Sequence, residues 1–309
     1  MADQEVYVNA LSILHSSGIR TLDSLSPWEN DQHGPHDIRR KQVLNTPYIA
    51  FGKLSLPDRL AFSAASLALR DCPLKSPDSA GLFCSIPCGS LSTDLLYRRS
   101  VADGAPSPAL FSATLPSSAI ADVAIYHHIK GPNAVFAGGD NAFSSALEYA
   151  LLNLRHGSLS EAIVIHVSEM ISSNPPPETG TSPCSAAMIL TTVPADVSRQ
   201  VTFLLEKTDG TEETAPSESE TVELLVYALE KNSTVRFPVS HGRFIGYISL
   251  HPAERNKFVI FPLIPALSEL DVLPFPRQDL QISDDYSQIP DVLRDPEDAV
   301  QFKSKFDLA

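Results

Sequence analysis

The sequence predicts a layered α/β fold with a mixed or parallel central sheet. Three observations support this prediction. Segments of strand length alternate with segments of helical periodicity, which is the pattern of βαβ units. The run Glu161 to Val167 is dominated by apolar residues, as in a strand that is buried on both faces of its sheet. The 309 residues are 43% hydrophobic and 19% charged, which suits one large globular domain or two small ones.

The first half of the chain contains elements of both kinds. The segment Leu56 to Arg70 has a proline in its first turn, where a helix needs no amide donor, and continues rich in alanine and leucine. We therefore expect a buried helix there. The other elements expected in this half are a strand over 5–14, an irregular excursion over 23–47, a strand over 81–86 and a helix over 91–101.

The middle of the chain continues the alternation. Apolar residues at Ile120, Val123 and Ala124 form one helical face, which predicts a helix over 117–129 after a proline-bearing loop. A short strand over 134–137 and a helix over 141–156 are expected next. Further strands are expected over 161–167, 184–193 and 201–206.

The character of the chain changes after residue 206. Thr, Glu and Ser dominate 207–220, which predicts a solvated loop or linker. A helix over 221–231 and short strands over 235–239, 244–250 and 257–261 are expected to follow. Prolines and acidic residues dominate the end of the chain. The sequence thus predicts three regions: 1–206, a shortened second part over 207–262, and a Pro-rich acidic tail over 263–309.

Composition excludes several classes of partner. The formal net charge is −14, and nucleic acids and anionic membranes are bound through basic patches, so we expect neither as a partner. No apolar run approaches the ~20 residues of a membrane-spanning helix and the N-terminus lacks signal-peptide features, which predicts a cytoplasmic protein. The four cysteines lack the spacing of a closed zinc site, and no Walker or dinucleotide fingerprint occurs. We expect no metal and no cofactor.

The stretch Gly131 to Asn141 carries the most informative motif. It consists of a Gly-Pro turn, a short apolar strand, the small-residue elbow Gly138-Gly139 and the start of a helix. This succession resembles the nucleophile region of β-ketoacyl synthases of the thiolase superfamily. Counting from Gly131-Pro132 without a gap puts Asp140 at the position of the family's nucleophilic cysteine.

Three further segments resemble the N-terminal half of a ketosynthase in the same order. They are Leu56 to Ala61, Gly81 to Phe83 and Ser107 to Pro116. The resemblance implies a thiolase-like layered α-β-α fold with a complete N-terminal half, so that 1–206 is a ketosynthase N-terminal-like domain. The rest of the chain is too short for a complete C-terminal half. The family's His-Gly-Thr-Gly and closing Gly-Phe-Gly-Gly motifs do not occur in it.

Asp140 changes the chemistry that the resemblance implies. A helix N-terminus stabilises a cysteine thiolate, which attacks a thioester. A carboxylate suits the same place as a helix cap but is a weak nucleophile toward a thioester. No catalytic residue is therefore expected. Ser240-His241-Gly242-Arg243 is the nearest equivalent of the first histidine motif, and His241 is either a relic of that motif or part of a polar turn between two strands.

The resemblance also implies a companion protein. In type II polyketide systems a cysteine-less paralogue, the chain length factor, forms a heterodimer with an active ketosynthase. Shortened versions accompany ketosynthases that build aryl polyenes. On this interpretation an acyl carrier protein docks mainly through the catalytic partner. The residues that would pair with the partner are Asn133, Ala134, Val135, Phe136 and Ala137.

The same resemblance implies a chain-length gate. Bulk at the far end of the partner's acyl tunnel would limit the number of extension cycles, because overpacking a closed cavity costs about 1–3 kcal/mol. Phe143 would plug the old substrate cavity of this chain. Ordinary interface or core packing explains each of these side chains equally well. The residues implied as the gate at the tunnel end are Leu110, Phe111, Thr114 and Leu115.

Three alternatives to a chain length factor exist. A stand-alone thioester hydrolase or decarboxylase would use Asp140 with a histidine such as His241 and would be active as the isolated chain. A purely structural scaffold would hold a biosynthetic complex together without affecting product length. The third alternative is an unrelated α/β domain, although an α/β-hydrolase is disfavoured because no Gly-x-Ser-x-Gly elbow occurs.

Overall fold

The computed structural model of the chain describes residues 6–252, except for 23, 30–33, 140, 170–182, 194–200, 209–220, 223–224, 227–234 and 242–243. The chain divides into two units, 1–263 and 264–309, and the second unit lies outside the described residues. The predicted strand over 257–261 and the predicted tail over 263–309 are also outside them. In the part that is described, no helix is long and apolar enough to cross a membrane.

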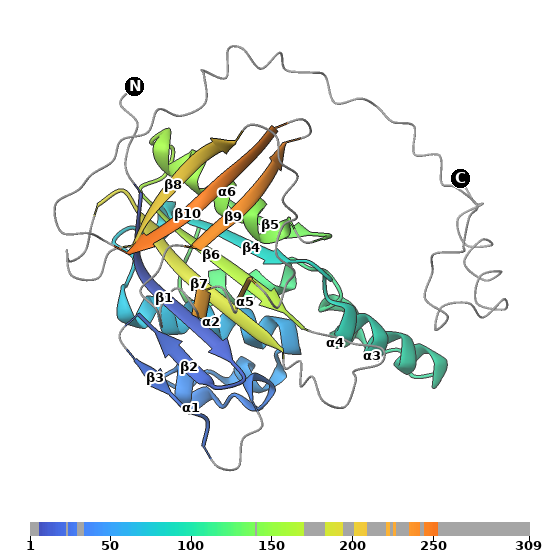
Figure 1. Cartoon of the computed structure of the whole chain (residues 1–309). Coiled ribbons are helices and arrows are strands. Elements are labelled where there is room, and N and C mark those ends of the chain that lie inside the picture. Colours follow the sequence, from blue (N-terminus) through green and yellow to red (C-terminus); the bar gives the residue numbers. More distant parts are fainter. Residues whose placement is uncertain are drawn as a thin grey trace, which may run out of the picture. The chain divides into compact units, whose positions relative to one another are not determined.

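A mixed sheet forms the centre of the first unit (Figure 1). Its strand order is β5-β4-β6-β7-β1-β8-β10-β9, and β2 and β3 branch from β1. β5, β4 and β6 run parallel, whereas the remaining neighbours are antiparallel, which confirms the predicted mixed sheet. The strands are β1 (Tyr7–His15), β2 (Gly18–Thr21), β3 (Leu25–Ser26), β4 (Gly81–Ile86), β5 (Asn133–Ala137), β6 (Glu161–Ser168), β7 (Cys184–Thr191), β8 (Val201–Thr208), β9 (Val235–His241) and β10 (Phe244–Pro252).

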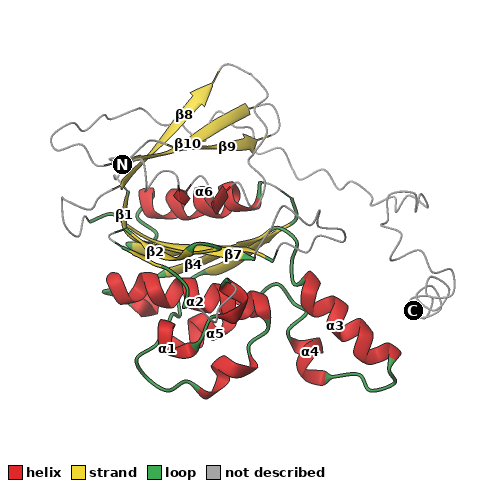
Figure 2. Cartoon of the chain, turned by 60° about the horizontal axis from the view of Figure 1, so that its bottom comes forward, coloured by secondary structure: helices red, strands yellow, loops and turns green. Residues whose placement is uncertain are grey.

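Helices cover both faces of the sheet (Figure 2). On one face α2 packs across β7, β1 and β6 and is flanked by α5, whereas on the other face α6 packs against β4, β6 and β5. α3 and α4 stand off to one side. The helices are α1 (Arg40–Val43), α2 (Leu56–Asp71), α3 (Leu91–Ala102), α4 (Pro108–Ser112), α5 (Ser118–Tyr126) and α6 (Ala142–Arg155), with short 3-10 turns at Pro35–Asp37, Ile49–Lys53 and Pro77–Ser79.

The alternation of side chains along the strands divides the core into two clusters. In β6, Ile163 and Ile165 belong to the cluster under α2, whereas Ala162 and Val164 belong to the cluster under α6. All eight residues of β6 are buried. Because successive side chains of a strand point to opposite faces, burial on both faces explains why the sequence of β6 is apolar throughout most of its length.

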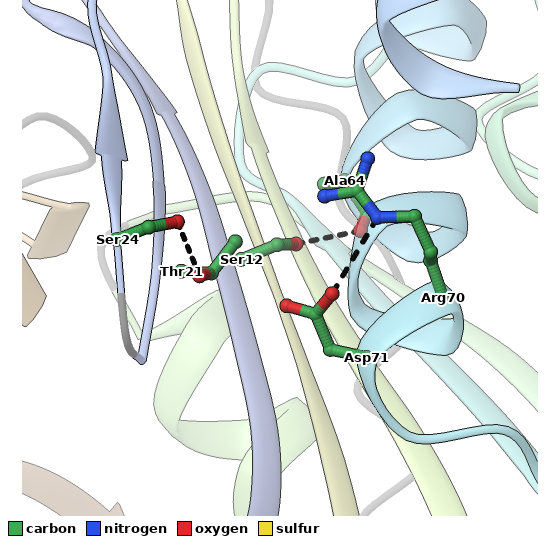
Figure 3. Close-up of polar contacts among 6 residues, drawn as sticks. All are labelled: Ser12, Thr21, Ser24, Ala64, Arg70 and Asp71. Carbon is green, nitrogen blue, oxygen red and sulfur yellow. Dashed lines mark hydrogen bonds and ion pairs between the residues drawn. The ribbon is translucent and has the colours of Figure 1, made fainter.

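Buried serines attach α2 to the sheet. Ser12 on β1 donates its hydroxyl to the Ala64 carbonyl oxygen at 2.6 Å, and Figure 3 shows this bond crossing from the strand to the helix. Ser185 on β7 donates to the Leu60 carbonyl oxygen at 3.1 Å. Both hydroxyls are fully buried, so each satisfied bond contributes about 0.5–1.5 kcal/mol. The predicted buried helix over 56–70 is confirmed.

A second layer of strands encloses α6. β8, β10 and β9 lie over the side of α6 that faces away from the central strands (Figure 2). Val222 and Leu225, which are helical and fully buried, belong to the same core cluster as α6. β8, β9, β10 and the helical residues Val222 and Leu225 therefore cover this side of α6. This arrangement confirms the predicted α-β-α layering with a shortened C-terminal half.

β3 and α1 lie in the segment 23–47, which was expected to be irregular, so this expectation was wrong in part. Two elements outside that segment, β2 and α4, were also not predicted. β2 pairs with β1 through the two-residue turn that ends at Gly18, whose φ is 141°. A Cβ at Gly18 would lie 2.3 Å from the Ser26 carbonyl oxygen, so the position requires glycine. α4 begins at Pro108, after Ser107 accepts a hydrogen bond from the Leu110 amide at 3.3 Å. Both elements are specified by turn and cap residues rather than by hydrophobic periodicity.

Candidate partner-binding face

β5 is an edge strand. Among the described strands it pairs with β4 alone, from Leu82 opposite Asn133 to Ile86 opposite Ala137. Asn133 and Ala137 are exposed, and the three residues between them are half-buried. The strand predicted to pair with a partner thus presents an open hydrogen-bonding edge in the described part of the chain. Such an edge is a template for a strand of another chain.

A two-glycine elbow leads from β5 into α6. Gly138 and Gly139 have φ values of 92° and 83°, in the left-handed region that favours glycine. The Gly138 amide donates to the Pro87 carbonyl oxygen at 2.9 Å, which ties the elbow to the loop after β4. The N-cap of α6 is Asn141, whose side chain makes no capping bond. Asp140 lies outside the described residues, so its role as a cap at the former cysteine position remains a prediction.

Phe143 lies in the core directly after this elbow. Its side chain is 2% exposed, and its ring centroid is 5.4 Å from that of His166 in an edge-on arrangement. His166 on β6 is itself buried, and its Nδ1 shares a hydrogen bond of 2.6 Å with the Ser85 hydroxyl. Phe143 is therefore a core side chain beside the elbow. Both of its predicted roles, plugging an old cavity and packing the core, require this position.

Residues 90–117 form a helical arm, made of α3, α4 and the turns around them. Figure 1 shows this arm projecting from the sheet next to β4 and β5. Thr93 is the single buried residue of α3, and α4 has none. The arm nevertheless carries many apolar side chains, whose exposed fractions range from 37% to 61%. They are Leu91, Leu95, Leu96, Val101, Phe111 and Leu115.

The arm is braced by its own contacts. The Ser100 hydroxyl donates to the Tyr97 carbonyl oxygen at 2.7 Å and accepts from the Ser107 amide at 3.2 Å. The rings of Tyr97 and Phe111 lie 5.4 Å apart, which joins α3 to α4. The Thr114 hydroxyl donates to the Phe111 carbonyl oxygen at 2.7 Å. The conformation of the arm is therefore set within the arm itself.

The four predicted gate residues lie together at the α4 end of the arm. Phe111 and Leu115 are each 61% exposed, whereas Leu110 and Thr114 are half-buried. Phe143 is separate from them and belongs to the core cluster of α6. The apolar surface of α3 was not predicted from the sequence. The leucines at 91 and 95, four residues apart beside polar neighbours, were the available signal for one apolar stripe.

Buried carboxylates attach both ends of the arm to the body. At the first end, Glu169 Oε2 accepts a hydrogen bond from the Ser92 amide at 2.8 Å. At the second end, Asp58 Oδ1 accepts from the Ser118 hydroxyl at 2.7 Å. Burial raises the pKa of both carboxyl groups, and the charge of Asp58 raises the pKa of Glu169 further. Sequence reasoning did not single out either residue.

The two ends of the arm meet beside each other. A Cβ at Gly89 would lie 3.6 Å from Pro116 Cγ. The arm therefore leaves the body and returns to it at one place.

His241 ends β9 and stands opposite Phe244 at the start of β10. Gly242 and Arg243 lie outside the described residues. The flanking strands β9 and β10 pair antiparallel, whereas the predicted turn between them lies outside the described residues. Its possible origin as a catalytic relic remains a prediction.

Structural comparison confirms the thiolase-like fold: the chain has the fold of ketosynthases and their chain length factors. It matches a chain of the ketosynthase ApeO in complex with its chain length factor ApeC from Xenorhabdus doucetiae, with a TM-score of 0.54 and 16% identity. The match covers 79% of this chain and 99% of the other.

Two further complexes give similar matches. The ishigamide ketosynthase/chain length factor matches with a TM-score of 0.57 and 13% identity. The AntDE:AntF complex, a type II acyl-carrier protein with its ketosynthase bound to the hexaketide, matches with a TM-score of 0.54 and 10% identity. Each match covers 81% of this chain and 99% of the other. The matched chains are thus shorter than this one. No protein-family model and no curated protein sequence matches the chain.

Proposed function

We propose that the chain is a non-catalytic chain length factor that pairs with an active ketosynthase and helps to shape its acyl tunnel. The observation that carries the proposal is an open edge strand beside an arm rich in exposed apolar side chains, on a thiolase-like fold. The bond between the Gly138 amide and the Pro87 carbonyl oxygen joins the end of β5 to the loop that leads from β4 into the arm. The two features therefore belong to one face.

The exposed side chains of the arm argue for a protein partner. Soluble monomers rarely expose large contiguous apolar patches, and fully burying a leucine or phenylalanine side chain contributes about 1.5–3 kcal/mol. A ketosynthase partner would cover the open edge of β5 with a strand of its own and would take up the arm in an apolar groove. The two matched complexes described as a ketosynthase with a chain length factor support this class of partner.

The α4 end of the arm suits a steric gate. Phe111 and Leu115 project into solvent, and Leu110 and Thr114 lie beside them. In a complex, these side chains would close the far end of the partner's tunnel. A growing acyl chain would then stop where the next extension unit no longer fits, because forcing extra methylene groups into a packed space costs about 1–3 kcal/mol. The product would be a polyketide or polyene of defined length.

The partner would supply the condensation chemistry. At the position aligned with the nucleophilic cysteine this chain has Asp140, and a carboxylate does not provide the thiolate that thioester exchange requires. The net charge of −14 disfavours docking of an acidic carrier protein on this subunit, so the carrier protein would bind mainly the ketosynthase. Both arguments assign the chain a shaping role.

Pairing is tested by co-expression with the product of a neighbouring ketosynthase gene, followed by sizing. We expect a one-to-one complex. Phe111→Asp and Leu115→Asp are expected to weaken the complex at least tenfold, because each leaves a charge in an apolar contact. Ile125→Asp is the matched control, since Ile125 is 70% exposed but lies on α5, outside the arm. A wild-type chain that never co-elutes with the ketosynthase, or equal weakening by Ile125→Asp, would contradict the proposal.

Product length separates a gate from a scaffold. In the reconstituted complex, Leu110→Trp is expected to shorten the main product, because it adds bulk at the proposed tunnel end. A scaffold predicts unchanged length and, at most, a change in yield. A stand-alone enzyme predicts that the isolated chain consumes malonyl or acyl thioesters. Turnover by the purified chain that Asp140→Asn abolishes would replace the proposal with that alternative.

A further inference from the structure

The first helix of the arm is capped by a residue that lies outside the arm, directly after β6. α3 begins after Ser90, which stands at the N-cap but makes no side-chain capping bond. Instead the Ser92 amide donates to Glu169 Oε2 at 2.8 Å. Glu169 follows β6 directly and is 4% exposed, and its Oε1 has no hydrogen-bond partner among the described residues. A carboxylate at a helix N-terminus is stabilised by the helix dipole, so this contact holds α3 by its first turn.

The second end of the arm is held in a similar way. Asp58, in the first turn of α2, accepts a hydrogen bond from the Ser118 hydroxyl at 2.7 Å. The same hydroxyl lies 3.3 Å from the Ala113 carbonyl oxygen, so Ser118 links α2 to the turn after α4. Asp58 is 5% exposed. Glu169 thus contacts α3 itself, whereas Asp58 holds the second end through Ser118, the first residue of α5 directly after the arm.

These two contacts stand out among those that the structure describes, because few residues of the arm are buried. Beyond Thr93, the residues of α3 are exposed or half-buried, and those of α4 are likewise. A helix of 12 residues is about 18 Å long, so a tilt of about 10° at its first turn moves its far end by about 3 Å. A displacement of that size is about the length of two methylene groups. Small changes at the first turn are therefore amplified along α3. Phe111, whose ring contacts that of Tyr97 near the middle of α3, would move by about half as much as the far end.

We propose that Glu169 and Asp58 are positioning residues that set the direction of the arm. The part of this inference that concerns product length depends on the proposed function as a chain length factor, whereas the mechanical part concerns this chain alone. In the complex, the pair would fix how far the gate residues reach into the tunnel of the partner.

The mechanical part is tested by hydrogen exchange on the whole chain. Glu169→Ala is expected to speed exchange of the amides over 91–102 at least tenfold, while β4, β6 and α6 keep their protection. Glu169→Gln retains an oxygen acceptor for Ser92 and is expected to restore slow exchange. Glu161→Ala is the matched control. Glu161 is a buried carboxylate that accepts hydrogen bonds from the Lys75 and Ser76 amides at 2.9 and 2.8 Å. It is the first residue of β6, at the opposite end of the strand from Glu169.

Three further variants complete the test. Ser92→Pro removes the same hydrogen bond from the helix side, at a first-turn position where proline fits, so it covers the case in which Glu169→Ala does not fold. At the second end, exchange is compared between Asp58→Ala and Asp58→Asn. The first removes the acceptor of the Ser118 hydroxyl, and the second keeps an oxygen acceptor for it. Unchanged exchange over 91–102 in Glu169→Ala and Ser92→Pro would overturn the inference. Equal acceleration in Glu161→Ala would overturn it as well.

Product analysis then connects the arm to function. In the reconstituted complex, Glu169→Ala is expected to broaden the distribution of product lengths, and Glu169→Gln to restore a single main length. Loss of stability alone would lower the yield without changing the distribution. If exchange over 91–102 rises but product length does not change, Glu169 positions the arm and the product-length part of this inference fails. If the wild-type chain forms no complex with the ketosynthase, the chain length factor proposal fails instead. The two failures are therefore distinguishable.

Discussion

Replacing Phe143 with alanine tests the core beside the elbow. The side chain is 2% exposed, and its ring packs edge-on against His166 at 5.4 Å. Removing a buried phenylalanine typically costs 3–5 kcal/mol, which includes the cavity left behind. Ala142 and Ala146, both buried on the same helix, have side chains too short to fill that cavity. We therefore expect a loss in the upper part of the range, about 4 kcal/mol.

The assay is urea or thermal unfolding of the purified chain. For a unit of this size, 1 kcal/mol shifts Tm by about 2–4 °C, so Phe143→Ala is expected to lower Tm by about 8–16 °C. Phe143→Leu leaves a smaller cavity and is expected to lose less than half as much. A loss below about 1 kcal/mol for Phe143→Ala would refute the reasoning, because it would mean that the ring is not packed in the core between α6 and β6.

Three other perturbations have definite expected outcomes. Ser12→Ala removes the buried hydrogen bond to the Ala64 carbonyl oxygen. It is expected to lower the free energy of unfolding by about 1–2 kcal/mol in urea titrations and to leave binding of a partner unchanged. Gly138→Ala places a side chain at φ 92°, so it is expected to lose about 1 kcal/mol although the added methyl group meets no neighbour. Burial and the charge of His128 together lower the pKa of His127 from 6.5 to about 4, so the folded state binds this proton less tightly than the unfolded state. The corresponding stability is complete above pH 6.5 and falls by about 2–3 kcal/mol as the pH drops to 4, a dependence that His127→Gln should remove in pH-dependent unfolding.

Much of the fold could be predicted because its elements have local signals. The strand at Gly81–Ile86 and the helix that starts at Leu56 were predicted from apolar runs and a first-turn proline, and both lie where expected. The edge position of β5 followed from the family resemblance. β2 and α4 were missed because each depends on a single turn or cap residue, Gly18 and Ser107, that interrupts no periodic pattern.

The candidate face was predicted only in part, for a physical reason. Leu96 looks like a core residue in the sequence but is 51% exposed, because α3 leaves the body after its first turn. Glu169 and Asp58 look like surface carboxylates but are buried where distant elements meet. Burial of this kind depends on tertiary contacts between β6, α2 and the arm, which no local pattern in the sequence reports.

Because Gly89 and Pro116 lie side by side, everything between them is topologically an insertion into a continuous scaffold. Lengthening such an insertion adds little entropic cost, about 0.6 kcal/mol for each doubling of a flexible loop. A swapped segment from a relative would need to match only these junctions, since the sheet does not pass through it. Variation in this segment is thereby uncoupled from the foldability of the rest. On the proposed function, product size would then be a trait that selection can adjust without altering the scaffold.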